Sequence, residues 1–510
     1  MTEMSQKEKK PWFRRKWPWI TAAGVLVAAG VATAGFLLPR GAEIPEGVLQ
    51  EPVVFTRQDQ LMVLFPGEKD EKGLGYCQSN LFNIACSSDG GALVWIDSSD
   101  FSAYYADAKG ETEKTLLGEY ADWVEISPDG RFAYCLRHTD GSGQESAGPM
   151  ELLCYDTRSG QSQVILSDME GDGPLVSESQ DALVRIITLS SGTYWLNLET
   201  GVAGVLTEAE VERVLAVSQG GSRAYYIQGR NLMGQSLGKE PEVLVENIGN
   251  AYFYPDGTGY YTMTYGEEKG LYWFDGNQGA LLDAQANLDT LESLGDSYRG
   301  SFDNMEMLLY LREGEDTLYT ACGDQVQSWL EGPASMGNTV LQNGTLYYLP
   351  TEGEERSIWA AELVDGTLSP PEERVTGVPA DINSFFVTEN GDVLYLRTEG
   401  GEFLFYSNGR LLEENPDISS SEGIQIPPSG GVYFIGNARG DRELTFAKEG
   451  RKTVLAKNVT QYVVLRENCV AALQEEQGVQ KLLLWEGPGE PVVLSENARG
   501  IFPVDTTAEE

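Results

Sequence analysis

A repeat of about 42 residues runs through most of this chain and limits the folds that it can adopt. Short apolar or aromatic segments end in glycine turns at Gly110, Gly160, Gly201, Gly238, Gly276, Gly323, Gly366, Gly409, Gly450 and Gly487. Asn-Gly and Asp-Gly turns between short runs rich in Tyr, Val, Leu and Phe are typical of β-hairpins. Four such strands fit into one repeat, which is the size of one β-propeller blade. The sequence therefore predicts an all-β fold, a β-propeller of about ten to eleven four-stranded repeats.

One repeat carries a recognisable motif. Residues 126–134 read Ile-Ser-Pro-Asp-Gly-Arg-Phe-Ala-Tyr, a tight turn followed by an aromatic residue. This segment resembles the core motif of the TolB-type propeller repeat. Residues 254–257 give a looser copy, and most other repeats keep only the glycine turn and the aromatic residue. The resemblance implies a propeller outside the cytoplasm that binds other proteins or covers the entrance of an enzyme.

The arrangement of the repeats is the next question. Common propellers have four to eight blades, so we expect two tandem rings, formed by residues 48–284 and 300–505. Residues 285–299 are predicted to form a helix-like connector, because apolar residues follow a helical spacing around them. Residues 53–65 and 501–504 are expected to share an eleventh blade. Residues 506–510 form a short acidic tail.

The N-terminus has the features of a membrane anchor. Residues 19–38 carry no charge, and twenty helical residues span about 30 Å, the thickness of a bilayer core. Basic side chains in residues 1–18 predict a cytoplasmic tail, and residues 39–47 would link the helix to the propeller outside the cytoplasm. The chain is thus predicted to be a single-pass membrane protein. The alternative is a cleaved signal peptide, with cleavage near Ala34 releasing a secreted form.

The net charge of the chain limits the kinds of molecule that it can bind. The formal net charge is −42, although residues 1–40 hold seven Lys and Arg side chains against two Glu side chains. Nucleic-acid-binding proteins usually present a basic patch, so nucleic acid is excluded as a partner. The acidity either keeps the protein soluble or attracts cations and basic partners.

Residue types that carry out catalysis are scarce. His138 is the only histidine, and it is predicted to lie in an exposed loop with a structural role. Residues 234–238 match the Gly-x-Ser-x-Gly pattern of a hydrolase nucleophile, but no helix is predicted to follow, and we interpret the match as a coincidental hairpin turn. Phosphate-cradling and dinucleotide-binding motifs do not occur. We therefore assign no catalytic residue and no cofactor.

Two further sets of residues are candidates for metal binding and for disulfides. Asp168, Glu170 and Asp172 alternate before a glycine, as at the start of a calcium loop, although the closing ligand of an EF-hand is missing. The alternative is a solvated acidic turn. An exported domain can form disulfides, and the candidate pairs are Cys135 with Cys154 and Cys77 with Cys86. The remaining cysteines, Cys322 and Cys469, are expected to be buried as small apolar residues.

These observations favour a non-enzymatic binding or scaffold module, anchored in the membrane, that presents a propeller surface to a protein or glycan partner. One alternative is an extracytoplasmic carbohydrate-active hydrolase that uses paired carboxylates in the propeller's central cleft. Another is a sensor that signals through the membrane helix. Six tryptophans could stack on sugars, but their strand positions favour packing between blades: Trp95, Trp195, Trp273, Trp329, Trp359 and Trp485.

Overall fold

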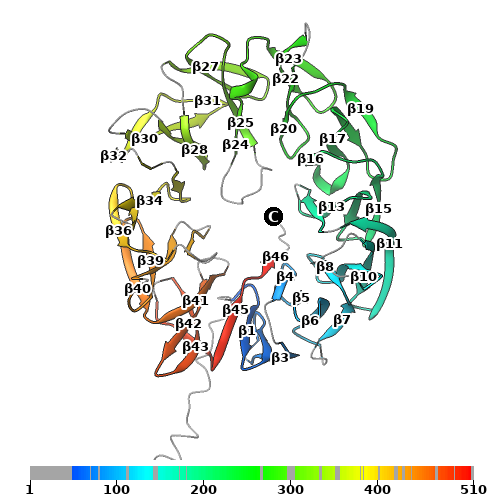
Figure 1. Ribbon diagram of the computed structural model, residues 1–510, viewed down its shortest axis with the longest axis vertical. Helices are drawn as coiled ribbons and strands as arrows, with labels where there is room; N and C mark the ends of the chain where they lie inside the picture. The colour runs from blue at the N-terminus through cyan, green and yellow to red at the C-terminus, as the bar shows by residue number, and fades with distance from the viewer. Residues whose placement is uncertain are drawn as a thin grey trace, which may run out of the picture.

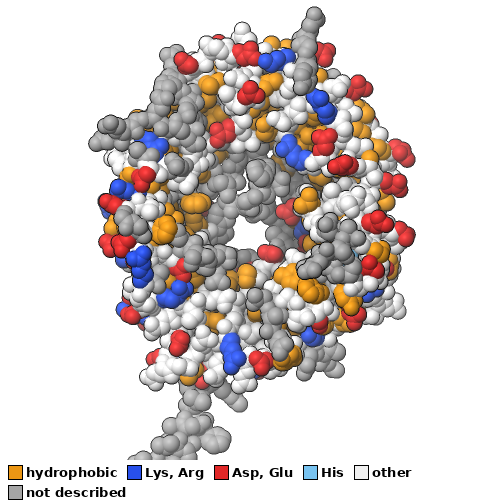
Figure 2. All heavy atoms as spheres, viewed as in Figure 1, with side chains coloured by type: hydrophobic (Ala, Val, Ile, Leu, Met, Phe, Trp, Pro, Cys, Tyr) orange, Lys and Arg blue, Asp and Glu red, His pale blue; other side chains and the backbone are white. Residues whose placement is uncertain are grey.

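The computed structural model forms one ring of eleven β-sheets (Figure 1), and the space-filling view shows a channel through its centre (Figure 2). It describes residues 49–506, except for residues 69, 78–80, 111–113, 142–147, 172, 180, 265–267, 296–304, 332–335, 351–355, 380, 383, 400–401, 418–422, 428–430, 438, 466–468 and 488. The sheets follow one another in chain order around the ring, as the colour gradient in Figure 1 shows. The predicted all-β propeller, with its number of repeats, is confirmed.

The strands of the first six sheets are as follows. The first sheet holds β1 (Val53–Arg57), β2 (Gln60–Leu64), β3 (Lys72–Tyr76) and β45 (Ala498–Phe502). The second holds β4 (Leu81–Cys86), β5 (Ala92–Asp97), β6 (Ser102–Asp107), β7 (Thr115–Gly118) and β46 (Asp505–Thr506). The third and fourth hold β8 (Ala121–Ile126), β9 (Phe132–His138), β10 (Gly148–Asp156), β11 (Gln161–Gly171), β12 (Leu175–Glu178), β13 (Val184–Leu189), β14 (Gly192–Asn197) and β15 (Val202–Thr207). The fifth and sixth hold β16 (Arg213–Val217), β17 (Ala224–Gln228), β18 (Asn231–Gln235), β19 (Glu242–Val245), β20 (Ala251–Phe253), β21 (Gly259–Met263), β22 (Gly270–Phe274) and β23 (Gly279–Asp283).

The remaining five sheets complete the ring. The seventh and eighth hold β24 (Glu292–Gly295), β25 (Met305–Leu311), β26 (Thr317–Cys322), β27 (Gln325–Glu331), β28 (Met336–Gln342), β29 (Thr345–Pro350), β30 (Arg356–Val364), β31 (Thr367–Leu368) and β32 (Glu372–Val378). The ninth and tenth hold β33 (Phe386–Val387), β34 (Val393–Glu399), β35 (Glu402–Ser407), β36 (Arg410–Glu414), β37 (Ile424–Gln425), β38 (Val432–Gly436), β39 (Glu443–Lys448) and β40 (Arg451–Ala456). The eleventh holds β41 (Val459–Val464), β42 (Cys469–Glu476), β43 (Val479–Glu486) and β44 (Val492–Glu496). Short 3-10 helices include η3 (Gln219–Gly221) and η5 (Leu288–Thr290).

The turn after the inner strand explains why the Ser-Pro-Asp-Gly motif recurs. Between β8 and β9, Ser127 Oγ accepts a hydrogen bond from the Phe132 amide at 2.9 Å and donates one to Asp129 Oδ1 at 2.8 Å. Gly130 adopts a φ of +67°, which favours glycine. The turns after β4 and β12 use a serine and an aspartate in the same way, at Ser87 with Asp89, and at Ser179 with Asp181. The motif is therefore a local device that reverses the chain at one end of the channel.

The core lies between neighbouring sheets. Apolar side chains from the facing surfaces of two successive sheets form each buried cluster, so both faces of a sheet are covered. Trp95 and Trp485 are fully buried in two of these clusters, which confirms the predicted packing between blades for both. The other four tryptophans are partly buried.

The two ends of the described chain close the ring in one sheet. Strand β45 is antiparallel to β1, with Phe55 opposite Ile501 and Val54 opposite Phe502. Ile501 and Phe55 are buried together with side chains of the eleventh sheet. The predicted sharing of one blade by residues near both ends is confirmed. The prediction of two tandem rings is wrong, because the eleven sheets form a single ring whose first and last sheets are neighbours.

The segment predicted as a helix-like connector joins two neighbouring blades. It contains only the single turn of η5 before β24 begins. Asp283, at the end of β23, accepts hydrogen bonds at its Oδ2 atom from Tyr310 Oη at 2.9 Å and from Arg312 Nε at 2.8 Å. Tyr310 lies in β25 of the seventh sheet, and Arg312 directly follows that strand. Three apolar residues of this segment, Ala286, Leu288 and Leu291, pack in the cluster at this blade junction instead. Helical spacing was therefore misleading here, because tertiary contacts fix the segment.

Residues 1–48 lie outside the described residues. They contain the predicted basic tail 1–18, the predicted membrane helix 19–38 and linker residues 39–47. Within the part of the chain that the structure describes, no helix has the length and apolar character needed to cross a membrane.

Candidate functional site

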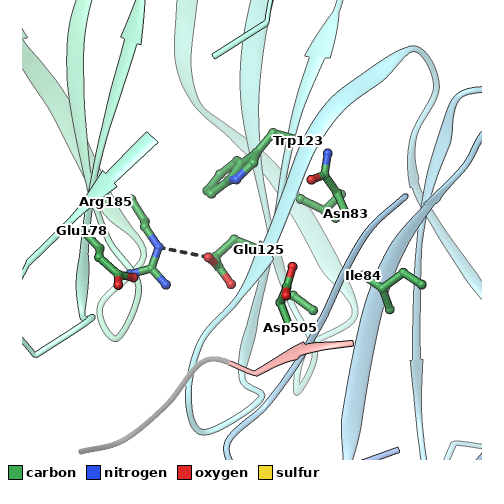
Figure 3. Close-up of a pocket in the computed structure, with 9 residues that line it drawn as sticks. Asn83, Ile84, Trp123, Glu125, Glu178, Arg185 and Asp505 are labelled. Carbon is green, nitrogen blue, oxygen red and sulfur yellow. Dashed lines mark hydrogen bonds and ion pairs between the residues drawn. The ribbon is translucent and has the colours of Figure 1, made fainter. Parts of the chain in front are cut away.

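A pocket of about 220 Å³ lies where three neighbouring sheets meet, and Figure 3 draws the residues that line it. Its walls come from strands β4, β8, β12, β13 and β46. The lining residues are Asn83, Ile84, Ala85, Trp123, Val124, Glu125, Glu178, Arg185 and Asp505. Figure 3 shows Glu125 between Trp123 and Asp505 in this view, with Arg185 and Glu178 approaching from the fourth sheet.

Irregular pairing of the two inner strands shapes this pocket. The pairing of β4 with β5 shifts register between Phe82 and Ala85, and that of β8 with β9 shifts between Ala121 and Trp123. Such bulges redirect side chains and are common beside binding sites. Asn83, which has a φ of +47°, donates from Nδ2 to the backbone oxygen of Asp122 at 3.1 Å. This bond joins the second sheet to the third at the pocket wall.

An ion pair between blades forms the floor of the pocket. Arg185 Nε donates to Glu125 Oε2 at 3.0 Å, from the second strand of the fourth sheet to the inner strand of the third. Arg185 Nη1 also donates to the Ala182 carbonyl at 2.6 Å and lies 3.3 Å from Glu178 Oε2. The side chains of Arg185 and Glu125 are only 7% and 12% exposed, whereas that of Glu178 is 51% exposed. Arg185 thus neutralises the buried carboxylate and leaves acidic groups facing the channel.

Burial governs protonation in this pocket. It raises the pKa of Glu125, and the Arg185 guanidinium offsets this only in part. Partial desolvation in the pocket also raises the pKa of Asp505, although the residue is exposed to solvent. Asp505 reaches the pocket because β46 pairs in parallel with the inner edge of β4, with Asp505 opposite Ala85. The residues at the end of the described chain therefore supply part of the site.

His138 lies next to this region but does not line the pocket. It ends β9, is 2% exposed, and its Nε2 atom lies 2.9 Å from Asp122 Oδ2. The prediction of an exposed loop histidine is wrong, because strand pairing buries it opposite Met150. Its structural role fits this contact with a buried carboxylate. His138 Nδ1 and Asp122 Oδ1 have no partner among the described residues.

The Gly-x-Ser-x-Gly match is a hairpin turn, as predicted. It begins inside β18, and the amide of Lys239 donates to the carbonyl of Ser236 at 3.0 Å before β19 begins. The segment therefore joins two strands of one sheet, whereas a hydrolase nucleophile elbow needs a strand followed by a helix.

The cysteine predictions have different outcomes. Cys135 lies opposite Leu153, and Cys154 lies opposite Tyr134, so the two cysteines point to opposite faces of the third sheet. Their side chains belong to different buried clusters, and the predicted Cys135–Cys154 bridge is therefore wrong. Cys77 and Cys86 belong to one buried cluster, so that pair stays a prediction. Cys469 is buried as expected, and Cys322 is partly buried.

The calcium candidate also stays a prediction. Asp168 and Glu170 are exposed at the end of β11, where Asp168 Oδ2 accepts a hydrogen bond from Ser167 Oγ at 2.9 Å. Asp172 lies outside the described residues. Among the residues that the structure describes, no group of three or more His, Cys, Asp or Glu side chains is placed to hold a metal ion.

Comparisons with known proteins give no family. No protein-family model matches the chain, and no curated protein sequence matches it. A solved structure described as the eukaryotic initiation factor is 11% identical, covers 89% of this chain and 98% of its own, and gives a TM-score of 0.39. Dipeptidyl peptidase 4 of Porphyromonas gingivalis is 10% identical over 81% of this chain and 59% of its own, with a TM-score of 0.33. The tricorn protease is 9% identical over 91% of this chain and 62% of its own, with a TM-score of 0.28. Likenesses at this level say nothing about function.

Proposed function

We propose that this chain is a membrane-anchored, extracytoplasmic β-propeller that acts as a non-enzymatic binding or scaffold module for a protein or glycan partner. The observation that carries the proposal is the channel-facing pocket, built on strands of three sheets and fixed by the buried Glu125–Arg185 pair. A rigid concave site with a few oriented polar groups is typical of ligand recognition. The lining residues of the pocket include no serine, cysteine or histidine that would act as a nucleophile or base.

Partner capture tests this function. The full-length chain, solubilised in detergent from its own membranes after cross-linking, is used as bait, and recovered proteins are identified by mass spectrometry. The same preparation is applied to a glycan array. We expect one partner, protein or glycan, that is lost from a Glu178→Gln/Asp505→Asn variant.

The matched control removes two acids elsewhere on the surface. Glu210 and Glu246 are exposed and lie outside the pocket, and the Glu210→Gln/Glu246→Gln variant has the same net charge as the pocket variant. It should keep the partner. Repeated failure to recover any specific protein, together with no glycan signal, would refute the binding function.

Anchoring and location need their own test. The predicted helix at residues 19–38 should keep the chain in the membrane pellet after alkaline carbonate extraction, with a mature mass that matches 55.9 kDa. Protease added to intact cells should reach the propeller after the cell wall or outer layer is removed. A smaller, soluble product cut near Ala34 would favour the secreted form.

A hydrolase is the second candidate, and one specific observation favours it. Glu125 and Asp505 line the same pocket, and burial raises the pKa of both carboxyl groups. Glycosidases use a carboxylic acid with a raised pKa beside a second carboxylate. Turnover in a screen of oligosaccharide substrates that disappears in the Asp505→Asn variant would establish this activity. Unchanged turnover in that variant would place the activity elsewhere.

A further inference from the structure

The pocket has the chemistry of a site for a cation. The Arg185 charge is balanced by Glu125, so Glu178 and Asp505 leave the pocket with a net negative charge. The indole ring of Trp123 lines the same pocket, and a tryptophan ring attracts a cation through its face. Carboxylates combined with an aromatic ring suit an ammonium or guanidinium group better than a neutral sugar.

Strand β12, which carries Glu178, offers an open edge beside the pocket. It is the terminal strand of the fourth sheet, and no further strand pairs with it among the described residues. Leu175 and Val176 on this strand are 73% and 37% exposed, which is unusual for an apolar side chain of an inner strand. An exposed edge with apolar side chains is a template for an added strand.

The chain itself shows that an extended segment fits on an inner edge. Strand β46 pairs with β4 in the neighbouring sheet, where Asp505 is opposite Ala85 and Thr506 is opposite Cys86. This pairing brings a side chain of the added strand into the pocket. A second added strand on β12 would place its side chains at the opposite wall.

We propose that the pocket holds the ammonium or guanidinium group of a lysine or arginine, presented by an extended segment of a partner protein that pairs with the open edge of β12. The inference rests on the proposed binding function and names the partner's chemistry. Glu178 and Val176 lie on one face of β12, about 7 Å apart. The segment therefore carries a basic residue opposite Glu178 and an apolar residue two positions away, opposite Val176.

The strongly acidic surface supports the same class of partner. The chain has a net charge of −42, which attracts basic segments over distances comparable with the Debye length. The pocket then gives the specificity, because long-range attraction alone does not distinguish one basic segment from another.

A defined peptide tests the proposal. The probe is fluorescein-labelled Thr-Val-Thr-Lys-Thr-Val-Thr with blocked termini, titrated with the full-length chain in detergent micelles and followed by anisotropy. One matched peptide has glutamate in place of the lysine, and a second keeps the lysine but has alternate backbone nitrogens methylated. We expect saturable binding of the probe, no binding of the glutamate peptide and at least tenfold weaker binding of the methylated peptide, since methylation removes the donors needed for strand pairing.

Variants of the protein locate the binding. Glu178→Gln/Asp505→Asn should weaken the probe about tenfold, as expected for two partly exposed charge contacts. Glu210→Gln/Glu246→Gln should change the affinity less than twofold, and thermal unfolding should confirm that both variants fold. Equal weakening in the two variants, or equal binding of the methylated peptide, would overturn the proposal. If the probe fails to bind while partner capture succeeds, the binding function stands and this inference falls; failure of both experiments refutes both.

Discussion

Removing Arg185 should destabilise the ring in a way that depends on pH. In the Arg185→Met variant the methionine fills much of the same volume, but Glu125 loses the guanidinium that neutralises it. Removing one partner of a buried pair costs about 3–5 kcal/mol, because it leaves an uncompensated charge. The amide of Ile126, at 3.1 Å from Oε1, donates to this carboxyl group and remains in the variant.

Protonation limits this cost. A stranded carboxylate can take up a proton, which costs about 1.4 kcal/mol for each pH unit above its ordinary pKa of about 4.3. The loss of stability caused by removing Arg185 can therefore not exceed about 4 kcal/mol at pH 7.5 and about 1.6 kcal/mol at pH 5.5. The Arg185→Met variant should thus lose about 3 kcal/mol of stability at pH 7.5 and no more than about 1.6 kcal/mol at pH 5.5.

Urea unfolding, followed by tryptophan fluorescence and circular dichroism, measures the effect. Arg158→Met is the matched control, because the ion pair between Arg158 and Asp129 spans 3.5 Å with side chains 69% and 50% exposed. An exposed pair is worth about 0–1 kcal/mol, so this control should change little at either pH. A loss below about 1 kcal/mol in Arg185→Met, or a loss that does not depend on pH, would refute the view that Glu125 is buried as a charge and depends on Arg185.

Four further predictions follow from other parts of the ring. Gly257→Ala should destabilise the protein by about 2–4 kcal/mol, because φ is +87° and a Cβ atom would lie 2.2 Å from the Tyr225 ring. Gly450→Ala, at φ +69° with open space around it, should cost only about 1 kcal/mol. Equal losses of stability in thermal unfolding would contradict the packing of Gly257 against Tyr225. Cys135 and Cys154 should both be alkylated after denaturation without reductant, because the strand register keeps them from forming a disulfide. Alkylation of the native protein should be slow, because burial raises the pKa values of the two thiols to about 12 and about 11. Detection by mass spectrometry of a disulfide-linked peptide that contains both cysteines would contradict the strand register. A chain ending at Asn497 should lose cooperative thermal unfolding, because it lacks β45, the strand that pairs with β1. A chain ending at Val504 should keep cooperative unfolding. Two similar melting curves would show that the pairing of β45 with β1 does not hold the ring together. Partial desolvation raises the pKa of Asp505 although the residue is exposed, so its proton is held more tightly in the folded state. The stability associated with this group is therefore greatest at low pH and is lost as pH rises above about 4. Asp505→Asn should slightly gain stability over the natural protein as pH rises, and a difference that stays constant in denaturation from pH 3.5 to 7.5 would refute this.

The pocket lined by Glu125, Glu178 and Asp505 could be predicted from the sequence only in part. Glu125 and Glu178 stand one or two residues before the serine of the Ser127 and Ser179 turns, so an alignment of the repeats would have placed both on inner strands. That signal was available. The sequence gives no comparable signal that Asp505 lies in the same pocket, because this depends on β46 pairing with β4, a strand more than 400 residues away in the chain.

His138 and the cysteines show the same division. The turn residues after His138 suggested a loop, but its burial follows from pairing with β10 and from contact with Asp122 on the neighbouring strand. Cys135 and Cys154 lie in neighbouring strands, but an offset of one residue in register places them on opposite faces of the sheet. The register of β9 with β10 is set along the whole pair of strands, from Met150 opposite His138 to Asp156 opposite Phe132, and is not visible in the spacing of two cysteines.

What the sequence determined by itself is local. Turn chemistry and a period of about 42 residues specify a four-stranded blade, because each serves to reverse or pair the chain within a few residues. The number of blades in a ring depends on the angle between packed sheets, which small differences at every interface set together. Only the tertiary structure could therefore decide that eleven blades form one ring, and that an arginine of the fourth sheet, a glutamate of the third and an aspartate of β46 share one pocket.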